Sequence, residues 1–374
     1  MIYFDAGATT LEKPAAVGRA MAQATHAMSS PGRGSYPASR RAEETAYLCR
    51  QEAAELLGVP QPENVIITTS ATHGLNIAIR SLLGSGDRVV ISGFEHNAVV
   101  RPLAALGAET VPAGTALFDP EETLRAFRDA VGPETTAVVC THVSNVFGYV
   151  LPLEDIADLC RDRGVPLIVD AAQSAGVLPL SLRRLGAAYV AMPGHKGLMG
   201  PQGTGVLLCG RVPERTLLEG GTGSLSREAA MPDFLPDRLE PGTQNVPGIA
   251  GLSAALGYLE RHGLAGAQER RLTRLLAERL RGLPGVRCFA GAPQSGVLSL
   301  QLEGMDCETV AAKLAERGIA VRAGLQCAPL AHRTAGTLET GTVRVSFSRF
   351  SRTGDAEALV RALRTLAGEQ TGRS

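Results

Sequence analysis

The stretch "AYVAMPGHKGLMGPQGTGVLLC" at 188–209 places two apolar runs on either side of a glycine-rich loop, which contains a single lysine, Lys196. Both runs are apolar throughout instead of alternating with polar residues, a pattern typical of strands buried on both faces. We therefore predict strands at 188–192 and 205–209 in a parallel sheet that helices cover on both faces. The function of the lysine in the loop is the question that the sequence raises.

Further runs of this kind lie upstream, and amphipathic stretches at 120–131 and 152–164 separate some of them. Alternation of buried strands with helices is typical of α/β folds. The additional predicted strands are "NVIITT" (64–69), "RVVIS" (88–92), "TAVVCTHV" (136–143) and "PLIVDAA" (166–172).

The pattern changes after about residue 248. Helices are predicted in "AQERRLTRLLAERLRGLPG" (267–285), in "DCETVAAKLAERG" (306–318) and from about 354 onward, and strands at 297–302, 319–324 and 342–348. This part is expected to form a smaller α+β domain. The segment 219–246, rich in glycine and proline, is predicted to be a long surface loop, and loops of that length are often functional.

Length, charge and cysteine content limit the class of protein. The chain has 374 residues, and its 37 lysines and arginines balance 37 acidic residues, which favours neither nucleic acid nor an anionic membrane as a partner. Its seven cysteines include no CxxC pair and are expected to be reduced thiols. The start resembles no secretory signal and no apolar run would span a bilayer, so we expect a cytoplasmic enzyme or ligand-binding protein.

Lys196 has three possible roles: binding phosphate, remaining solvated, or acting as a chemical reagent. A P-loop requires Ser or Thr after the lysine and a preceding glycine pattern, but Gly197 follows here. Asp170 ends a predicted buried strand, where an unpaired carboxylate is costly and where α/β sheets bind ligands. A protonated pyridine nitrogen is one candidate for its partner.

Pyridoxal phosphate chemistry requires such a pair, because a lysine forms the Schiff base and an acid keeps the ring nitrogen protonated. It also requires a phosphate site. "TTSATHGLN" at 68–76 predicts a strand end that leads into a helix, where the N–H groups of Ala71, Thr72 and His73 are expected to be free to bind an anion.

Taken in order, these motifs resemble one family. The landmarks are "SATHGLN", "EHNAVVRP", "HVSNVFG", "VDAAQSAG", "GHKGLMGPQGTG", "PGTQNVPGI", "RAGLQCAP" and "GTVRVSFS". The sequence resembles the class V aminotransferase-type, fold type I pyridoxal phosphate enzymes, and within them the cysteine desulfurase and selenocysteine lyase group. The resemblance extends from the motif at residues 4–10 to the motif at residues 342–348. The resemblance implies a large domain (15–247) with a mostly parallel seven-stranded sheet between helices. It also implies an N-terminal arm (1–14) that packs with a small α+β domain (248–374), which carries the cysteine loop.

The resemblance also implies roles for individual residues. Lys196 would hold the cofactor and take the Cα proton, Asp170 would pair with the ring nitrogen, and Gln173 would bond the ring hydroxyl oxygen. His96 would stack on the ring, and Asn145 would lie near the ring oxygen and the substrate carboxylate. The phosphate would be bound by Ala71, Thr72, His73 and His195, and by Thr243 of a neighbouring subunit, which implies a homodimer.

Two residues bear on the reaction itself. Arg344 lies in a predicted strand, where a buried guanidinium requires an anion, and a substrate carboxylate would fit; an internal salt bridge is the alternative. Cys327 follows a glycine turn and would accept the substrate sulfur as a persulfide. Cys327 and His332 alone do not make a zinc site, so no metal is expected.

The resemblance thus implies a cysteine desulfurase that converts L-cysteine to L-alanine and passes sulfur from Cys327 to an acceptor protein or a small thiol. Three alternatives stay open. They are a selenocysteine lyase, another class V lyase or aminotransferase in which Cys327 is incidental, and a non-catalytic protein whose lysine merely contacts a phosphate ligand.

Overall fold

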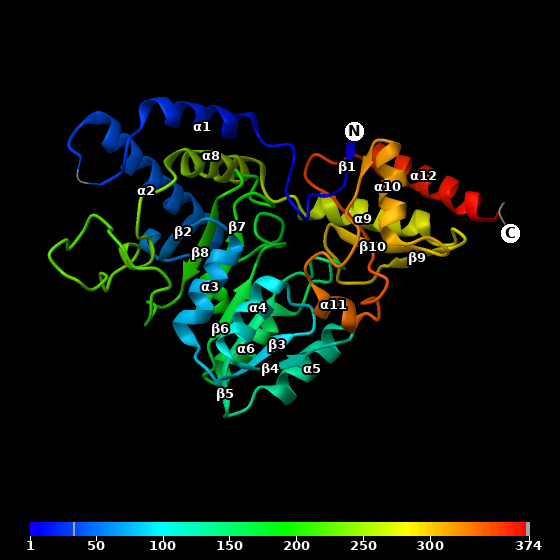
Figure 1. Cartoon of the computed structure of the whole chain (residues 1–374), viewed down its shortest axis with the longest axis horizontal. Coiled ribbons are helices and arrows are strands. Elements are labelled where there is room, and N and C mark those ends of the chain that lie inside the picture. Colours follow the sequence, from blue (N-terminus) through cyan, green and yellow to red (C-terminus); the bar gives the residue numbers. More distant parts are fainter. Residues whose placement is uncertain (33, 372–374) are drawn as a thin grey trace.

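A computed structural model describes residues 1–32 and 34–371, arranged as a larger and a smaller body (Figure 1). The larger body is built on one seven-stranded sheet in which every neighbouring pair is parallel except the two pairs made by the strand β8 (Gly205–Cys209). This arrangement confirms the prediction of a mostly parallel sheet. In spatial order the strands are β2 (Val65–Thr68), β8 (Gly205–Cys209), β7 (Tyr189–Pro193), β6 (Leu167–Asp170), β5 (Thr135–Thr141), β3 (Arg88–Ser92) and β4 (Glu109–Ala113).

Six of these strands lie at the positions predicted from apolar runs, but β4 was not among them. β4 pairs only with β3 at one edge of the sheet, and most of its residues are partly or fully exposed. An edge strand needs no continuous apolar run, and proline is tolerated there, as at Pro112. The hydrophobic pattern of the sequence therefore did not predict β4.

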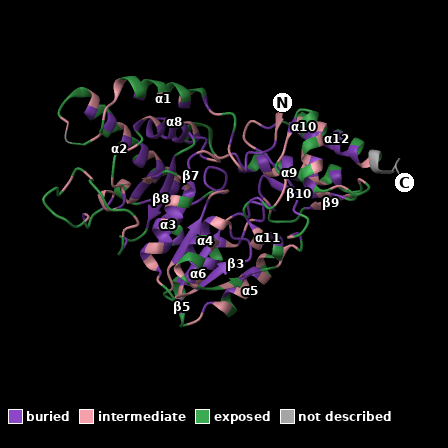
Figure 2. Cartoon of the chain, viewed as in Figure 1, coloured by how far each residue is buried: buried purple, intermediate pink, exposed green. Residues whose placement is uncertain are grey.

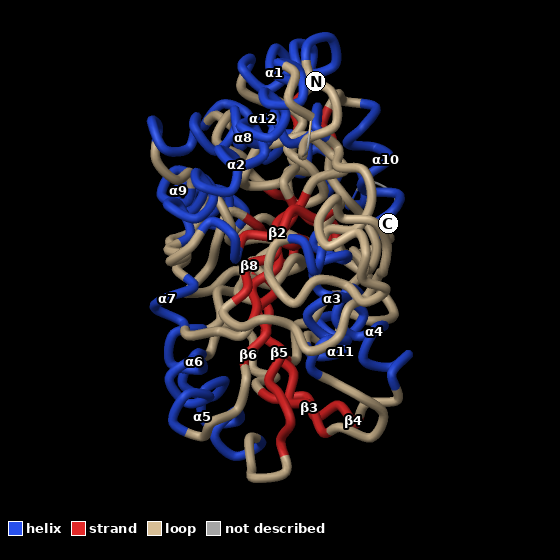
Figure 3. Tube along the Cα trace, turned by 90° about the vertical axis from the view of Figure 1, so that its left-hand side faces the viewer, coloured by secondary structure: helices blue, strands red, loops and turns tan. Residues whose placement is uncertain are grey.

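Helices cover both faces of the sheet, which Figure 3 shows along its edge. Alternate residues of one strand enter different cores: Val138 and Cys140 of β5 join one, whereas Ala137 and Val139 join the other. The first core is closed by α2 (Pro37–Leu57), α5 (Pro120–Ala130), α6 (Leu153–Asp162), the short α7 (Leu182–Leu185) and α8 (Val246–His262). The second is closed by α3 (Ala71–Leu82) and α4 (Asn97–Leu106).

The smaller body has its own apolar core, formed around a three-stranded antiparallel sheet. The sheet has the order β12 (Val343–Ser346), β10 (Val297–Leu302), β9 (Val286–Phe289), and it packs with α9 (Gly266–Leu280), α10 (Cys307–Glu316) and α12 (Thr353–Thr371). The short α11 (Pro329–Thr334) follows the cysteine loop. The N-terminal arm reaches this body because β1 (Ile2–Tyr3) pairs in parallel with β11 (Ile319–Ala320), and Phe4 is buried in its core.

The expected domain boundary between residues 247 and 248 falls inside α8. Leu252, Leu256 and Leu259 of this helix are buried in the core of the larger body, and α8 packs along α1 (Ala15–Ala27) and α2 (Figure 1). Apart from Phe4 of the N-terminal arm, the first buried residue in the core of the smaller body is Leu272 of α9. By packing, therefore, α8 belongs to the larger body.

The long segment between β8 and α8 contains little regular structure apart from one short 3-10 helix at Asp237–Leu239. Figure 2 shows much of it exposed where it projects from the larger body. Glu240 anchors it, because this buried carboxylate pairs with Arg50 of α2 and accepts the N–H of Ile67 at the sheet edge, 2.6 Å away. In the part of the chain that is described, no helix is long and apolar enough to cross a membrane.

Candidate active site

Lys196 lies in the tight loop that joins β7 to β8. Within this loop the N–H of Gly194 donates to the carbonyl of Thr204 (2.8 Å), and the N–H of Gly200 donates to the carbonyl of Gly194 (2.7 Å). A Cβ on Gly197 would lie 2.3 Å from the carbonyl oxygen of Ala175, so a side chain there would collide with backbone. The loop is rich in glycine because neighbouring backbone segments pack directly against it.

A cavity opens at the edge of the sheet where β2, β5, β6 and β7 end. These strands run in the same direction, so their carboxyl ends meet there, the usual place for a ligand in an α/β sheet. Eight of the residues predicted to form the site line this one cavity: Ala71, Thr72, His96, Asn145, Asp170, Gln173, His195 and Lys196.

The pKa values of Asp170 and Lys196 are both shifted in this cavity. Burial raises the pKa of Asp170, while the N–H of Ala172, 2.8 Å from Oδ1, and the charge of Lys196 oppose that rise. Burial and the positive charge of Arg344 lower the pKa of Lys196 to about 8. Oδ2 of Asp170 accepts no hydrogen bond from the described residues, so it is the oxygen that remains available to a ligand.

Both histidines of the cavity are held neutral. His96 caps α4 by accepting the N–H of Ala98 on Nδ1 (3.0 Å), and burial together with Lys196 lowers its pKa to about 4. His195 is 3.0 Å from the hydroxyl of Thr9 in the N-terminal arm, and burial lowers its pKa to about 4 as well. A neutral imidazole can lie against a flat aromatic ring without adding charge to the cavity.

The start of α3 differs from its predicted form at one residue. Ser70 caps the helix by accepting the N–H of His73 (3.1 Å), so this N–H is not free, and the His73 side chain does not line the cavity. The N–H groups of Ala71 and Thr72 have no acceptor within the helix and lie at the positive end of its dipole. An anion would therefore meet two free N–H groups here, not three.

Asn145 and Gln173 line the cavity, but their amides already have partners. The amide of Asn145 donates to the carbonyl of Gln326 (2.8 Å), and that of Gln173 donates to the carbonyl of Gly7 (2.9 Å). Both bonds join the cavity wall to segments distant in the chain, namely the cysteine loop and the N-terminal arm.

Arg344 does not line the cavity and forms the internal ion pair that was the alternative to a substrate contact. Its Nη2 is 2.9 Å from the carboxylate of Asp5, its Nη1 donates to the carbonyl of Asn145, and its Nε is buried without a partner. Asp5 also binds Arg322 through two nitrogens. Asp5 was not predicted as a site residue, although its position in the motif "FDAGATT" was a signal.

Cys327 is the exposed cysteine of the seven, and it lies on a loop fastened to the cavity wall. Its carbonyl accepts the N–H of Asn97, next to His96, at 2.8 Å. Gln326 and Cys327 both have positive φ angles, of 43° and 57°. The buried Gln326 side chain bonds to His332 and to the carbonyl of Thr342, so it holds this strained turn in place.

Glu95 was also not predicted as a residue of the site, although it lies in the motif "EHNAVVRP" beside His96. This fully buried carboxyl accepts the hydroxyl of Ser92 (2.5 Å) and the N–H of Thr141 (2.6 Å), so it ties the end of β3 to the end of β5. Thr243, by contrast, is exposed on the long segment and does not line the cavity of its own chain. Its contact with a neighbouring subunit stays a prediction.

The cavity fits pyridoxal phosphate on its own chemistry. It presents one amine of lowered pKa, a buried carboxylate with a free oxygen, and two free N–H groups at a helix start for the phosphate. Among the described residues, no group of three or more His, Cys, Asp or Glu side chains could hold a metal ion.

Comparison with known proteins identifies the family. The model of the aminotransferase class V family matches residues 2–359. The chain belongs to the aminotransferase class V family. One relative is a probable cysteine desulfurase of Methanothermobacter thermautotrophicus, which is 33% identical over 98% of this chain and 95% of its own.

Two solved structures resemble this class V chain, and the second of them contains the cofactor. A cysteine desulfurase from Thermococcus onnurineus superposes with a TM-score of 0.88 and 28% identity over 98% of this chain and 95% of its own. The C-DES enzyme, solved as a lysine variant with glycine covalently linked to pyridoxal phosphate, has a TM-score of 0.80 and 26% identity, over 97% of this chain and 96% of its own. Pyridoxal phosphate is therefore the cofactor of this class V chain.

Proposed function

We propose that this chain is a pyridoxal-phosphate-dependent cysteine desulfurase, which removes sulfur from L-cysteine and releases L-alanine. The proposal rests on one arrangement: Lys196 and Asp170 share a cavity, and the loop of Cys327 is bonded to Asn97 and Asn145 at its wall. Similarity to proteins named cysteine desulfurase supports it.

The chain's own residues would divide the work. Bound pyridoxal phosphate supplies an electron sink for the substrate. Lys196 takes the Cα proton, since its pKa of about 8 leaves part of it as the free amine near neutral pH. Asp170 would keep the ring nitrogen of the cofactor protonated through its free Oδ2, and His96 would lie over the ring. Arg344 is paired with Asp5 and does not line the cavity here, so it could bind the substrate carboxylate only if its guanidinium turned partly away from Asp5.

Sulfur transfer balances without an external oxidant. The thiolate of Cys327 attacks the substrate sulfur, the electrons of the carbon–sulfur bond pass to the carbon, and that carbon takes a proton. The enzyme thiol and L-cysteine thus become an enzyme persulfide and L-alanine. The exposure of Cys327 supports onward transfer of the sulfur to an acceptor protein or a small thiol.

We further propose that the enzyme is a homodimer in which Thr243 reaches the partner's phosphate site. Four large apolar side chains on the long segment are 41–56% exposed, namely Val212, Leu218, Leu225 and Phe234, which a second copy would cover. The seven cysteines are all free, and Cys327 acts only when reduced, which supports a cytoplasmic location.

The test is the visible spectrum of the purified protein before and after addition of L-cysteine, combined with analysis for alanine. We expect a coloured protein that forms alanine, and we expect Lys196→Ala to lose both the covalent chromophore and the activity. Lys13→Ala, which changes a partly exposed lysine nearby, is the matched control and should keep the chromophore. A colourless wild-type protein, or a Lys196→Ala variant with full activity, would refute the proposal.

A further inference from the structure

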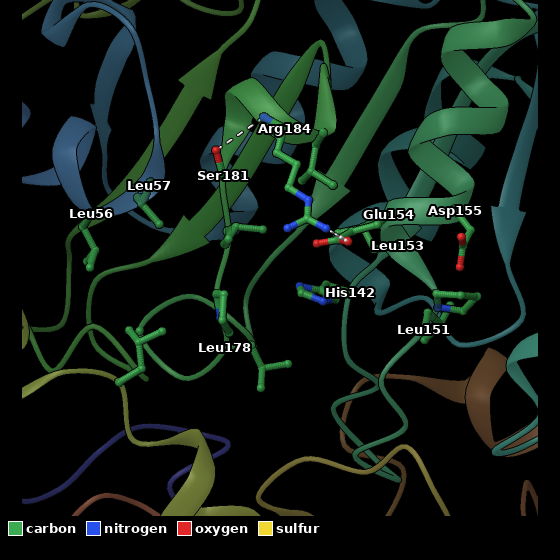
Figure 4. A pocket seen from close by; sticks show the side chains of 16 residues that line it. Leu56, Leu57, His142, Leu151, Leu153, Glu154, Asp155, Leu178, Ser181 and Arg184 are labelled. Atoms are coloured by element: carbon green, nitrogen blue, oxygen red, sulfur yellow. Dashed lines mark hydrogen bonds and ion pairs between the residues drawn. The ribbon is translucent and has the colours of Figure 1, made fainter.

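A second cavity lies apart from the lysine cavity, between the end of α2, the start of α6 and the segment 176–185 (Figure 4). Its volume is about 510 Å³, within the range of sites that hold small molecules. The two cavities have no lining residue in common. The proposed reaction therefore makes no use of this space.

The body of this second cavity is apolar. Its charged groups are Glu154, Asp155 and Arg184, whose side chains are exposed at the rim, and Arg184 forms an ion pair with Glu154 (Figure 4). Two carboxylates against one guanidinium disfavour an anionic ligand. The apolar lining consists of Leu56, Leu57, Leu151, Pro152, Leu153, Leu178, Pro179, Leu180, Leu185 and Leu264.

Two uncharged polar side chains line this space, and of these Ser181 already accepts the N–H of Arg184, which leaves His142 facing the apolar space (Figure 4). Neither ring nitrogen forms a hydrogen bond with the described residues, and Nδ1 is sealed from solvent, so Nε2 is the nitrogen that a ligand can reach. Burial lowers the pKa of His142 to about 4, so the ring is neutral at physiological pH. A neutral imidazole nitrogen is satisfied by a hydroxyl group, which both donates and accepts.

We propose that this cavity binds a small, neutral, largely apolar molecule whose hydroxyl group forms a hydrogen bond with His142. A phenol with one ring has the required character. L-cysteine does not, because it carries two charges and little apolar surface. The inference goes beyond the desulfurase reaction and stands independently of it.

The second cavity lies next to backbone segments that carry residues of the lysine cavity. The N–H of His142 donates to the carbonyl of Asp170 at 3.0 Å. Gly176, another lining residue, lies so close to the lysine loop that a Cβ there would be 2.3 Å from the carbonyl oxygen of Gly197. An occupant would thus rest on segments that position Asp170 and Lys196.

The test compares 4-ethylphenol with ethylbenzene, which has the same shape without the hydroxyl, by titration calorimetry on the enzyme loaded with pyridoxal phosphate. The bound cofactor fills the lysine cavity and prevents binding there. We expect His142→Phe to weaken 4-ethylphenol binding about tenfold and to change ethylbenzene binding less than about twofold. His26→Phe, at an exposed histidine on α1, is the matched control and should change neither.

A second variant keeps the test decisive if His142→Phe disturbs folding. Asp155→Trp places a large ring at the exposed rim and should weaken binding of both compounds, with an unchanged melting temperature. The proposal is wrong if the wild-type enzyme binds no 4-ethylphenol at millimolar concentration, which would leave water as the occupant. It is also wrong if both variants bind 4-ethylphenol as tightly as the wild-type enzyme does.

Discussion

Single residues set the chemistry of the lysine cavity through burial and through the charges nearby. Lys196 is shifted toward its neutral form by burial and by Arg344, whereas Asp170, Asp5 and Cys327 oppose that shift. The position of Asp170 at a strand end and of Ala71 and Thr72 at a helix start could be predicted from the sequence pattern, whereas the family resemblance supplied His96, Asn145, Gln173 and His195. It did not predict their present partners, since the bonds from Asn145 to Gln326 and from Gln173 to Gly7 join segments far apart in the chain.

The pKa of Lys196 predicts how covalent uptake of pyridoxal phosphate by the cofactor-free protein depends on pH. Only the neutral amine attacks the aldehyde, and with a pKa of about 8 its fraction rises from about a tenth at pH 7 to about nine tenths at pH 9. The rate, followed by absorbance in stopped flow, should therefore rise with pH and level off above pH 9. Nα-acetyl-lysine in solution, whose ε-amine is free and has an ordinary pKa of about 10.4, is the control, and its rate should still be rising at pH 9. A midpoint near 10 for the protein would contradict the assignment.

The role of Cys327 predicts that Cys327→Ser stops sulfur transfer but leaves cofactor binding intact. The hydroxyl cannot accept sulfur as a persulfide, so alanine formation from L-cysteine should fall at least about a hundredfold. Cys288→Ser, at a partly buried cysteine of the smaller body, should keep its activity. Full activity of Cys327→Ser would favour a lyase that forms no persulfide. The elimination of selenium from L-selenocysteine would then be the next reaction to measure.

At the scale of elements, the N-terminal arm joins the two bodies. β1 adds a strand to β11, Phe4 packs edge-to-face on Phe347 at 5.3 Å, and Thr10 donates to the carbonyl of Lys196 at 2.9 Å. The motif at 4–10 marked this segment as important, but a two-residue strand is too short for periodicity to reveal. Its pairing partner lies more than 300 residues away and follows only from the folded chain.

The burial of Phe4 predicts that Phe4→Ala destabilises the protein by about 3–5 kcal/mol, because it removes apolar contacts and leaves a cavity. The free energy of unfolding in urea measures this loss. Leu11→Ala, at a leucine of the same arm that is 55% exposed, should change stability by less than about 0.5 kcal/mol. Equal effects of the two substitutions would mean that the arm is not docked as described.

At the scale of the whole molecule, we propose that a second copy of the chain covers the long segment before α8 and takes up the exposed Thr243. The segment is fastened at Glu240 yet exposes large apolar side chains beyond that anchor. The lysine cavity has two free N–H groups for a phosphate, so a hydroxyl from a partner would complete it.

We therefore expect sedimentation to give about twice the chain mass of 39.0 kDa. The double substitution Leu218→Asp and Phe234→Asp should shift the protein to monomer by charging the exposed apolar surface. Leu11→Asp, at an equally exposed leucine outside that segment, should leave the dimer intact. A wild-type monomer would refute the dimer and with it the role of Thr243.

By itself the sequence determined the α/β sheet, the lysine and aspartate that share its carboxyl edge, and the family. These features are recorded locally, in apolar runs, strand ends and short motifs. Tertiary structure decided that Arg344 pairs with Asp5, that Gln326 holds the turn of Cys327, that Ser70 takes the N–H of His73, and that α8 packs with the larger body. Each of these depends on which polar group finds a partner once water is excluded, and such pairings are fixed only when distant segments are packed together.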